Sequence, residues 1–171
     1  MRDEVLHIAR KAREASHALG NLSTQVKNSV LDGMAEALLL SAGKLKEANA
    51  LDLKGAKEAG LSSAMIDRLT LSDAVIRRMA ASLKEIALLP DPVGEVGRMW
   101  KRPNGLTVGK MRIPLGVIGI IYESRPDVTS DAAGLCLKAG NAVILRGGSE
   151  AIRSNLVIVE VLQQVCRERE I

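Results

Sequence analysis

The chain has 171 residues, of which 47% are hydrophobic and 1% aromatic, and its formal net charge is +4 at pH 7. This length and apolar content support a packed core and exclude disorder as the main state of the chain. With no Phe and almost no other aromatic residue, the chain lacks a platform on which the bases of a single-stranded nucleic acid could stack. No apolar run is long enough to span a bilayer. We therefore expect no nucleic-acid partner and no membrane partner.

The chain contains two cysteines, Cys136 and Cys166, each in a helical and largely apolar setting. This is typical of reduced core thiols rather than of a disulfide framework. No His follows Cys136 to act as its base, so a buried structural thiol is favoured over a nucleophile. His7 and His17 are too far apart for a metal site on one helix face, and no metal site is expected. The first residues lack a hydrophobic signal core, which favours a cytoplasmic protein.

Residues 1–89 are predicted to form a helical layer. Apolar residues recur at helical spacing, and Gly, Ser, Thr and Asp residues separate the periodic segments as helix caps do. This layer contains no catalytic motif. The predicted helices begin near Val5, at Ser23 or Thr24, at Lys44, at Ser62 or Ser63 and at Ser72 or Asp73, and the last ends at Leu89.

Residues 90–113 are predicted to form a linker and a β-hairpin. Asn104-Gly105 lies between two extended runs, and this dipeptide is typical of a hairpin turn that needs left-handed residues. The hairpin is basic, with no acidic residue between Glu95 and Glu123. Two interpretations of this charge remain open. In the first, the positive charge protects an edge ribbon against aggregation. In the second, residues 98–112 bind an anion or a partner, and a nucleic acid would be one such partner.

Residues 114–171 carry the signals of a β-α-β-α unit. The apolar, β-branched run 115–121 is predicted to be a strand buried on both faces. Pro126 stops it and opens a helix that ends at Ala139, with Gly140 as its C-cap. Residues 142–145 form a second buried strand, followed by a helix over 150–168. This order predicts parallel strands joined by a right-handed crossover, and hence the α/β class with a Rossmann-like sheet.

The loops that follow the two predicted strands lie where open α/β sheets bind ligands. Arg146 ends the second strand, where a β-α-β nucleotide unit faces the adenosine ribose, and an Arg there favours the 2′-phosphate of NADP. The backbone N–H groups of Gly147-Gly148-Ser149 could approach an anion, or Ser149 could simply cap the next helix. Glu123 and Arg125 could bind substrate or pair with each other. A complete G-x-G-x-x-G fingerprint is absent.

The strings PLGVIGIIYESRP over 114–126 and LCLKAGNAVILRGGSE over 135–150 closely resemble the gamma-glutamyl phosphate reductases, or glutamate-5-semialdehyde dehydrogenases. LSSAMIDRL over 61–69 and DPVG over 91–94 extend the resemblance to essentially the whole chain. Within the aldehyde dehydrogenase superfamily, a helical region precedes a Rossmann-like cofactor domain. The resemblance thus implies a helical region over 1–89, an oligomerisation-type ribbon over 90–113, and the first part of an NADP-binding domain over 114–171.

The resemblance also implies an activity: NADPH-dependent reduction of L-glutamyl 5-phosphate to L-glutamate 5-semialdehyde and phosphate in proline biosynthesis. It implies a homo-oligomer and makes glutamate kinase a candidate partner. The wider superfamily has Asn and Lys where this chain has Ser124 and Arg146. By resemblance, the residues beside the cofactor are Ile121, Tyr122, Glu123 and Ser124, and those beside its adenosine ribose are Arg146, Gly147, Gly148, Ser149 and Glu150.

The family's nucleophilic Cys belongs to a later domain. We therefore expect this chain to be an N-terminal portion of a larger enzyme and to be inactive alone, because hydride transfer needs a thioester that only a positioned thiolate can form. The alternative is a non-catalytic cofactor-binding or assembly module.

Overall fold

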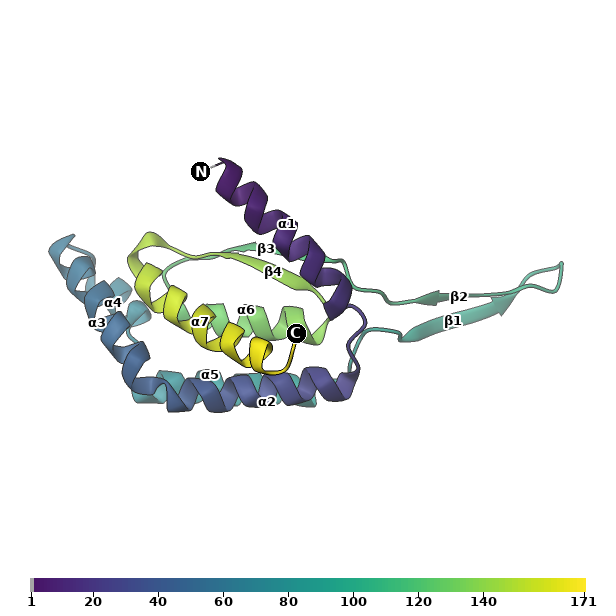
Figure 1. Cartoon of the computed structure of the whole chain (residues 1–171), viewed down its shortest axis with the longest axis horizontal. Coiled ribbons are helices and arrows are strands. Elements are labelled where there is room, and N and C mark those ends of the chain that lie inside the picture. The colour runs from purple at the N-terminus through teal and green to yellow at the C-terminus, as the bar shows by residue number, and fades with distance from the viewer. Residues whose placement is uncertain (1) are drawn as a thin grey trace.

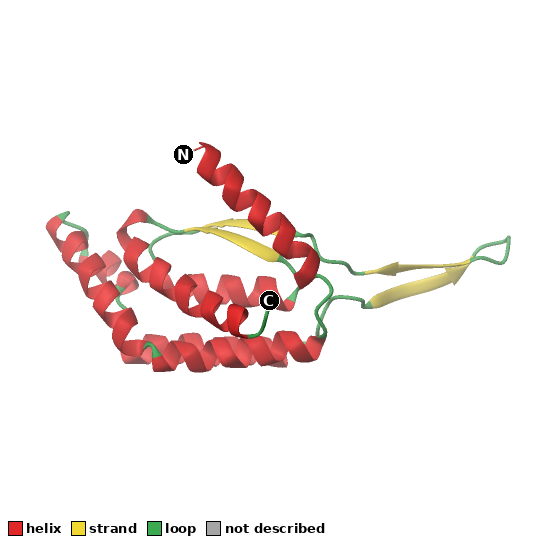
Figure 2. Cartoon of the chain, in the orientation of Figure 1, coloured by secondary structure: helices red, strands yellow, loops and turns green. Residues whose placement is uncertain are grey.

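The computed structural model describes residues 2–171, and most of them are helical (Figure 2). In chain order the elements are α1 (Arg2–Leu19), α2 (Thr24–Leu40), α3 (Ala42–Glu58), α4 (Ser63–Leu69), α5 (Asp73–Leu88), β1 (Val96–Lys101), β2 (Thr107–Met111), β3 (Val117–Ile121), α6 (Pro126–Lys138), β4 (Ala142–Arg146), the short 3₁₀ helix η1 (Ser149–Ala151) and α7 (Ile152–Glu168). The helices and strands stack in layers, and the hairpin of strands β1 and β2 projects from the body (Figure 1).

Three of the N-terminal helices begin at the serines that the sequence indicates. The hydroxyl groups of Ser23, Ser62 and Ser72 each accept a hydrogen bond from the backbone N–H three residues later, over 3.3 to 3.4 Å. These bonds satisfy N–H groups that a helix leaves without an internal partner, so the predicted N-caps are confirmed. Helix α3 begins at Ala42, two residues before the predicted start at Lys44.

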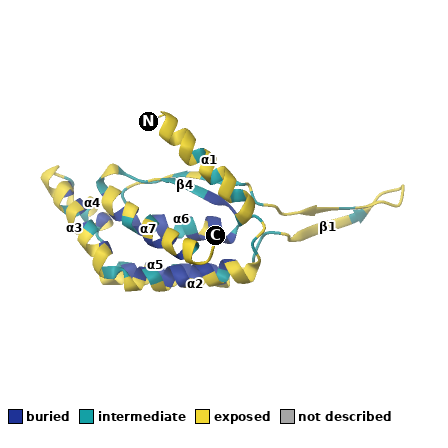
Figure 3. Ribbon diagram, in the orientation of Figure 1, coloured by how far each residue is buried: buried dark blue, intermediate teal, exposed yellow. Residues whose placement is uncertain are grey.

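One core joins the helical region to the β-α-β-α unit. Helices α2 and α5 pack against each other and against α6 and α7, whose own buried faces complete the cluster. The contact between α5 and α6 is close: a Cβ atom at Gly134 would lie 2.6 Å from Cδ2 of Leu83. Figure 3 shows the buried residues concentrated on these facing helices, while α1 and the hairpin are mostly exposed. Representative core residues are Val30, Leu31, Leu38, Ile76, Leu83, Leu137, Ile158 and Leu162.

The two strands β3 and β4 form a parallel pair, as predicted, with Ile121 opposite Arg146. The predictions that β3 is buried on both faces and that β4 is a second buried strand are wrong. No residue of β3 is buried, Ala142 alone is buried in β4, and Ile121 is 78% exposed. The reason is tertiary: α6 packs on this sheet from one side, α1 covers the other side only in part, and both strands lie at an edge. The strand also starts later than predicted, because Gly116 turns the chain with φ +102°.

The strands β1 and β2 pair in antiparallel fashion, which confirms the predicted hairpin. Its turn differs from the one that Asn-Gly predicts. Gly105 has φ +88°, whereas Asn104 is not left-handed, and the N–H of Gly105 donates to the carbonyl of Arg102 over 2.9 Å. The central residues of this turn are Pro103 and Asn104 rather than Asn104 and Gly105. The ring of Pro103 fixes its φ near −65°, which suits the first central position of an ordinary turn and leaves only Gly105 left-handed.

A buried ion pair joins α2 to the linker that leads into the hairpin. Lys27 is completely buried, and its Nζ lies 3.1 and 3.0 Å from the two carboxylate oxygens of Asp91. Asp91 also accepts hydrogen bonds from Thr24 Oγ1 (2.8 Å) and from the backbone N–H of Val93 (3.0 Å). Burial alone would raise the pKa of Asp91, but the hydrogen bonds from Val93, Lys27 and Thr24 outweigh it and hold this pKa below its ordinary value of 3.8.

Replacing Lys27 by Met should lower the free energy of unfolding by about 3 kcal/mol, because it leaves a largely buried carboxylate without its cation. Urea unfolding followed by circular dichroism measures the change. The control is Lys44→Met, which removes an ion pair to Glu160 whose partners are 53% and 59% exposed and should cost less than about 1 kcal/mol. Equal losses in the two variants would contradict the role assigned to Lys27.

The contribution of Asp91 should depend on pH. Because its folded pKa lies below its unfolded value, the stabilisation is fully present above the unfolded pKa and is lost as pH falls through the folded pKa. We therefore expect the wild-type chain to lose more unfolding free energy than Asp91→Asn between about pH 6 and about pH 3. Parallel curves for the two proteins over that range would show that the folded pKa of Asp91 is not lowered.

Candidate functional site

The loops after β3 and β4 leave the sheet at the same edge. Ile121 pairs with Arg146 in the last register position, and the backbone N–H of Tyr122 donates to the carbonyl oxygen of Arg146 over 3.1 Å. Parallel pairing brings the carboxyl ends of neighbouring strands together, which is where open α/β sheets carry their ligand sites. The nine residues predicted to lie beside a cofactor, over 121–124 and 146–150, are therefore gathered at this edge.

A hydrogen bond joins the two loops directly. Ser124 Oγ donates to Glu150 Oε2 over 2.8 Å. The pKa of Glu150 is lowered, first by a hydrogen bond from its own backbone N–H, then by the Ser124 hydroxyl, with smaller contributions from Ser149 and from the positive charge of Arg146. The carboxylate of Glu150 is therefore ionised at neutral pH and is held at the start of η1.

Two glycines allow the loops to approach so closely. A Cβ atom at Gly148 would lie 2.5 Å from Ser124 Oγ and 2.6 Å from Glu150 Oε2. A Cβ atom at Gly147 would collide with Nδ2 of Asn155 and would lie 3.0 Å from the ring of Tyr122. A larger residue at Gly148 would push aside the hydrogen-bonded side chains of Ser124 and Glu150, and one at Gly147 would displace Asn155 and the Tyr122 ring.

A chain of polar side chains lies under the loops. The hydroxyl groups of Tyr122 and Thr129 are 2.6 Å apart, and Thr129 Oγ1 donates to Asn155 Oδ1 over 3.0 Å. Nδ2 of Asn155 is buried beside Gly147 and has no hydrogen-bond partner among residues 2–171. Burial raises the pKa of Tyr122, although the bond to Thr129 opposes this, so the phenol stays protonated and serves as a hydrogen-bonding group. No local sequence pattern predicted such a role for Thr129 or Asn155.

The free backbone N–H groups at the start of α7 donate to a carboxylate from α3. Asp52 Oδ2 accepts hydrogen bonds from the backbone N–H and the hydroxyl of Ser154, both over 2.8 Å, and Oδ1 accepts the N–H of Arg153 over 3.3 Å. The alternative prediction of Ser149 as the helix N-cap is wrong, because the residue before η1 is Gly148 and α7 has no cap from a neighbouring side chain. An anion at this edge would meet the loop 147–150 rather than the first turn of α7.

Glu123 and Arg125 lie in the tight turn after β3. The backbone N–H of Arg125 donates to the carbonyl of Glu123 over 2.8 Å, and both side chains are exposed. Within the described chain, the two side chains do not form the ion pair that the sequence left open. Arg125 instead lines a cavity of about 230 Å³ between α4, α5 and α6.

The cysteines lie away from this edge. Cys136 is buried, as predicted, and burial raises its pKa. Burial also raises the pKa of Cys166, although Arg167 and Arg169 oppose the shift. Across residues 2–171, no group of three His, Cys, Asp or Glu side chains could hold a metal ion. The same part of the chain contains no helix with the length and apolar character needed to cross a membrane.

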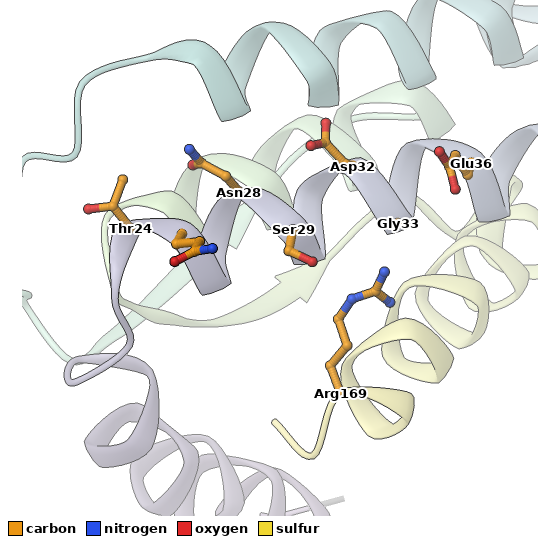
Figure 4. Close-up of a pocket in the computed structure, with 8 residues that line it drawn as sticks. Thr24, Asn28, Ser29, Asp32, Gly33, Glu36 and Arg169 are labelled. Carbon is orange, nitrogen blue, oxygen red and sulfur yellow. The ribbon is translucent and has the colours of Figure 1, made fainter.

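A larger hollow, of about 700 Å³, lies at the opposite end of α7 from the loops (Figure 4). It opens between α2 and the residues that follow α7, and its lining is polar. Arg169 reaches over Gly33, where a Cβ atom would collide with the guanidinium group. The residues labelled in this hollow include none of those that the sequence predicts for a cofactor or substrate.

Known proteins similar to this chain were found by sequence and by structure, although no protein-family model matches it. The gamma-glutamyl phosphate reductase of Geotalea daltonii is 61% identical over 166 residues, which are 97% of this chain and 40% of that protein. The crystal structure of the gamma-glutamyl phosphate reductase of Thermotoga maritima superposes with a TM-score of 0.94 at 42% identity, over 96% of this chain and 40% of that one. The chain thus spans about two fifths of the length of these relatives.

A more distant likeness supports the fold alone. An NAD-dependent benzaldehyde dehydrogenase from Corynebacterium glutamicum superposes with a TM-score of 0.69 at 18% identity, over 90% of this chain and 31% of that one. Together with the Thermotoga maritima structure, it confirms the predicted fold class: a helical layer, a hairpin and the first strands of a Rossmann-like parallel sheet, as in aldehyde dehydrogenases.

The close approach at Gly147 gives a test of the loop packing. Gly147→Ala should lower the free energy of unfolding by about 1–3 kcal/mol, because Asn155 and the Tyr122 ring must move aside. Urea unfolding measures the change in the free energy of unfolding. Gly119→Ala in β3 is the matched control: its Cβ would meet nothing within 4 Å, so we expect it to leave stability unchanged or to raise it by about 0.5–1 kcal/mol. A neutral Gly147 variant would rule out the close packing.

Proposed function

We propose that this chain supplies the dinucleotide-binding edge of a gamma-glutamyl phosphate reductase, which reduces L-glutamyl 5-phosphate with NADPH to L-glutamate 5-semialdehyde and phosphate in proline biosynthesis. The observation that carries the proposal is the convergence of Arg146, Ser124 and Glu150 at one sheet edge. The identity of 61% to a gamma-glutamyl phosphate reductase over nearly the whole chain supports the same activity.

The choice of NADP rests on Arg146. Its side chain is exposed at the end of β4, near enough to Glu150 to lower the pKa of that carboxyl. Glu150 is itself engaged by its own backbone N–H and by Ser124, so the guanidinium is left to pair with a 2′-phosphate. An acidic residue at this place would instead select the free 2′-hydroxyl of NAD. We propose that Ile121, Tyr122, Glu123 and Ser124 flank the cofactor and that Gly147, Gly148, Ser149 and Glu150 lie with Arg146 at the ribose.

The cofactor, when bound, supplies the hydride, and the residues of this chain bind and orient it. Neither cysteine of the chain suits the nucleophile that the reaction needs, since burial raises the pKa of both Cys136 and Cys166. A thioester requires a positioned thiolate. We therefore propose that this chain alone does not carry out the reduction and that Glu123 and Arg125 contribute to the substrate side of the site.

The hairpin favours a second candidate role, that of a non-catalytic assembly module. Val96, Met99, Leu106 and Met111 are each more than half exposed on it, although they are apolar. Unpartnered apolar side chains on an exposed β-ribbon are typical of a surface that another chain covers. We propose that the assembled enzyme is a cytoplasmic homo-oligomer joined through β1 and β2, with glutamate kinase as the partner that supplies the acyl phosphate.

The cofactor assignment is tested by binding adenosine 2′,5′-bisphosphate, which carries the 2′-phosphate and lacks the nicotinamide. Arg146→Ala should weaken its binding to the chain by about tenfold to a hundredfold, the equivalent of one charge-assisted hydrogen bond. Isothermal titration calorimetry measures the affinities, and adenosine 5′-monophosphate should bind both proteins equally. Arg98→Ala on the hairpin is the control and should change neither affinity. An Arg146 variant that binds the bisphosphate as tightly as the wild type would refute the assignment.

A further inference from the structure

The cavity of about 230 Å³ lies where the end of α4, the start of α5 and the start of α6 meet. Leu71 and Pro126 are buried in its lining and Val75 is half-buried, so part of the wall is apolar. The charged side chains that line it come from three different helices and the turns beside them. They are Asp67, Arg68, Arg78, Arg125 and Asp127.

These charges do not neutralise one another. Over residues 2–171, none of the three arginines forms an ion pair with a carboxylate, although two aspartates share the cavity with them. Asp127 is oriented by its own helix, since its Oδ1 accepts the backbone N–H of Val128 over 3.1 Å. A cavity with separate cationic and anionic groups beside an apolar wall is complementary to a zwitterion that has a short hydrocarbon chain.

The backbone around the cavity is fixed from within the core. Asn49, which is buried in α3, donates through Nδ2 to the carbonyl of Leu69 and accepts the N–H of Leu71 at Oδ1, both over 2.8 Å. These two bonds set the turn between α4 and α5, and hence the separation of Arg68 from Arg78. A site built on elements that are held in this way loses little entropy when a ligand binds.

We propose that this cavity binds the α-amino-acid end of L-glutamyl 5-phosphate, the substrate of the proposed reduction. The α-carboxylate lies against the guanidinium groups, which match carboxylates in a bidentate geometry. The α-ammonium lies against Asp67 and Asp127, and the methylene chain lies along Leu71 and Val75. This inference rests on the proposed function, and it gives the helical layer, in which the sequence indicated no catalytic motif, most of the contacts to the α-amino-acid end.

The position of the cavity relative to the sheet edge fits this assignment. Arg125 lines the cavity, and its chain neighbour Ser124 contacts Glu150 in the loop assigned to the cofactor. The tight turn over 123–125 thus has the cavity on one side and the cofactor edge on the other. A glutamyl group whose α-ammonium and α-carboxylate are bound in the cavity would extend its phosphorylated carboxyl group toward that edge.

The test is an NMR titration of the ¹⁵N-labelled chain with L-glutamate. We expect saturable shifts of the backbone amides over 67–78 and 125–128. Arg78→Gln should weaken binding by about tenfold or more, and Arg68→Gln should do the same, as expected for the loss of a charge-assisted contact. Arg77→Gln is the matched control: this exposed arginine is the neighbour of Arg78 on α5 but does not line the cavity, and its removal should leave the affinity unchanged. The amide spectrum of each variant shows that it is folded.

Three related compounds identify the recognised groups. Glutarate lacks the ammonium, 4-aminobutyrate lacks the α-carboxylate, and inorganic phosphate tests a simple anion site; each should bind at least about tenfold more weakly than L-glutamate. Phosphate binding at the same amides without L-glutamate binding would overturn the proposal. So would the absence of L-glutamate shifts in a chain that still binds adenosine 2′,5′-bisphosphate, an outcome that leaves the cofactor assignment intact. Binding of L-glutamate without the bisphosphate would overturn only the cofactor assignment.

Discussion

The carboxylate of Asp52 holds the start of α7 from a helix about one hundred residues earlier in the chain. Asp52 is almost completely buried, and it satisfies both the backbone N–H and the hydroxyl of Ser154. Asn49, one turn before it, donates to the same hydroxyl over 3.1 Å. A helix start needs acceptors for its free N–H groups and is stabilised by negative charge. The position of the loop 147–150, which comes directly before this helix turn, therefore depends on α3.

The contact of Asp52 with α7 adds to a shared hydrophobic core, and this core explains why the helical region and the parallel strands form one body. A pair of parallel strands buries too little surface to be stable alone, and here α6 and α7 reach the main core by packing on α2 and α5. Lys27 and Lys138 show how tightly these layers meet. Both lysines are buried, and Lys138 donates to Asn28 Oδ1 over 2.6 Å and to the carbonyl of Ala87 over 2.8 Å. Burial lowers the pKa of Lys138, and the cost of burying both charges is offset by their hydrogen bonds.

The sequence predicts the order of the elements because that order depends on local chemistry. Serine hydroxyls set the helix starts at Ser23, Ser62 and Ser72, and Gly140 ends α6 with a left-handed φ of +71°. Once the two strands are predicted to be parallel, it follows that the carboxyl ends of β3 and β4 lie together. Strand burial was predicted incorrectly because the apolar run 115–121 does not reveal how much of each face other elements will cover.

The contacts that complete the site depend on residues far apart in the chain. Thr129 and Asn155 meet across 26 positions, and Asp52 and Ser154 across 102. Local patterns carry little information about such pairs. One signal was present in α3, where Asn49 and Asp52 occupy the same helix face as the buried Leu45 and Ala56. Polar residues at core-facing positions indicate a buried partner, although they do not identify it.

Helix α1 differs from the other long helices, because none of its residues is buried and Val5, Leu6 and Ile8 are each more than two fifths exposed. Segments with few buried apolar contacts open locally at a small fraction of the global unfolding free energy. Since α1 packs against β3 and β4, each such opening uncovers one face of the sheet while the helical core stays folded. We therefore expect the amides of α1 to exchange through this opening, whereas those of β3 and β4 stay protected by the hydrogen bonds between the two strands.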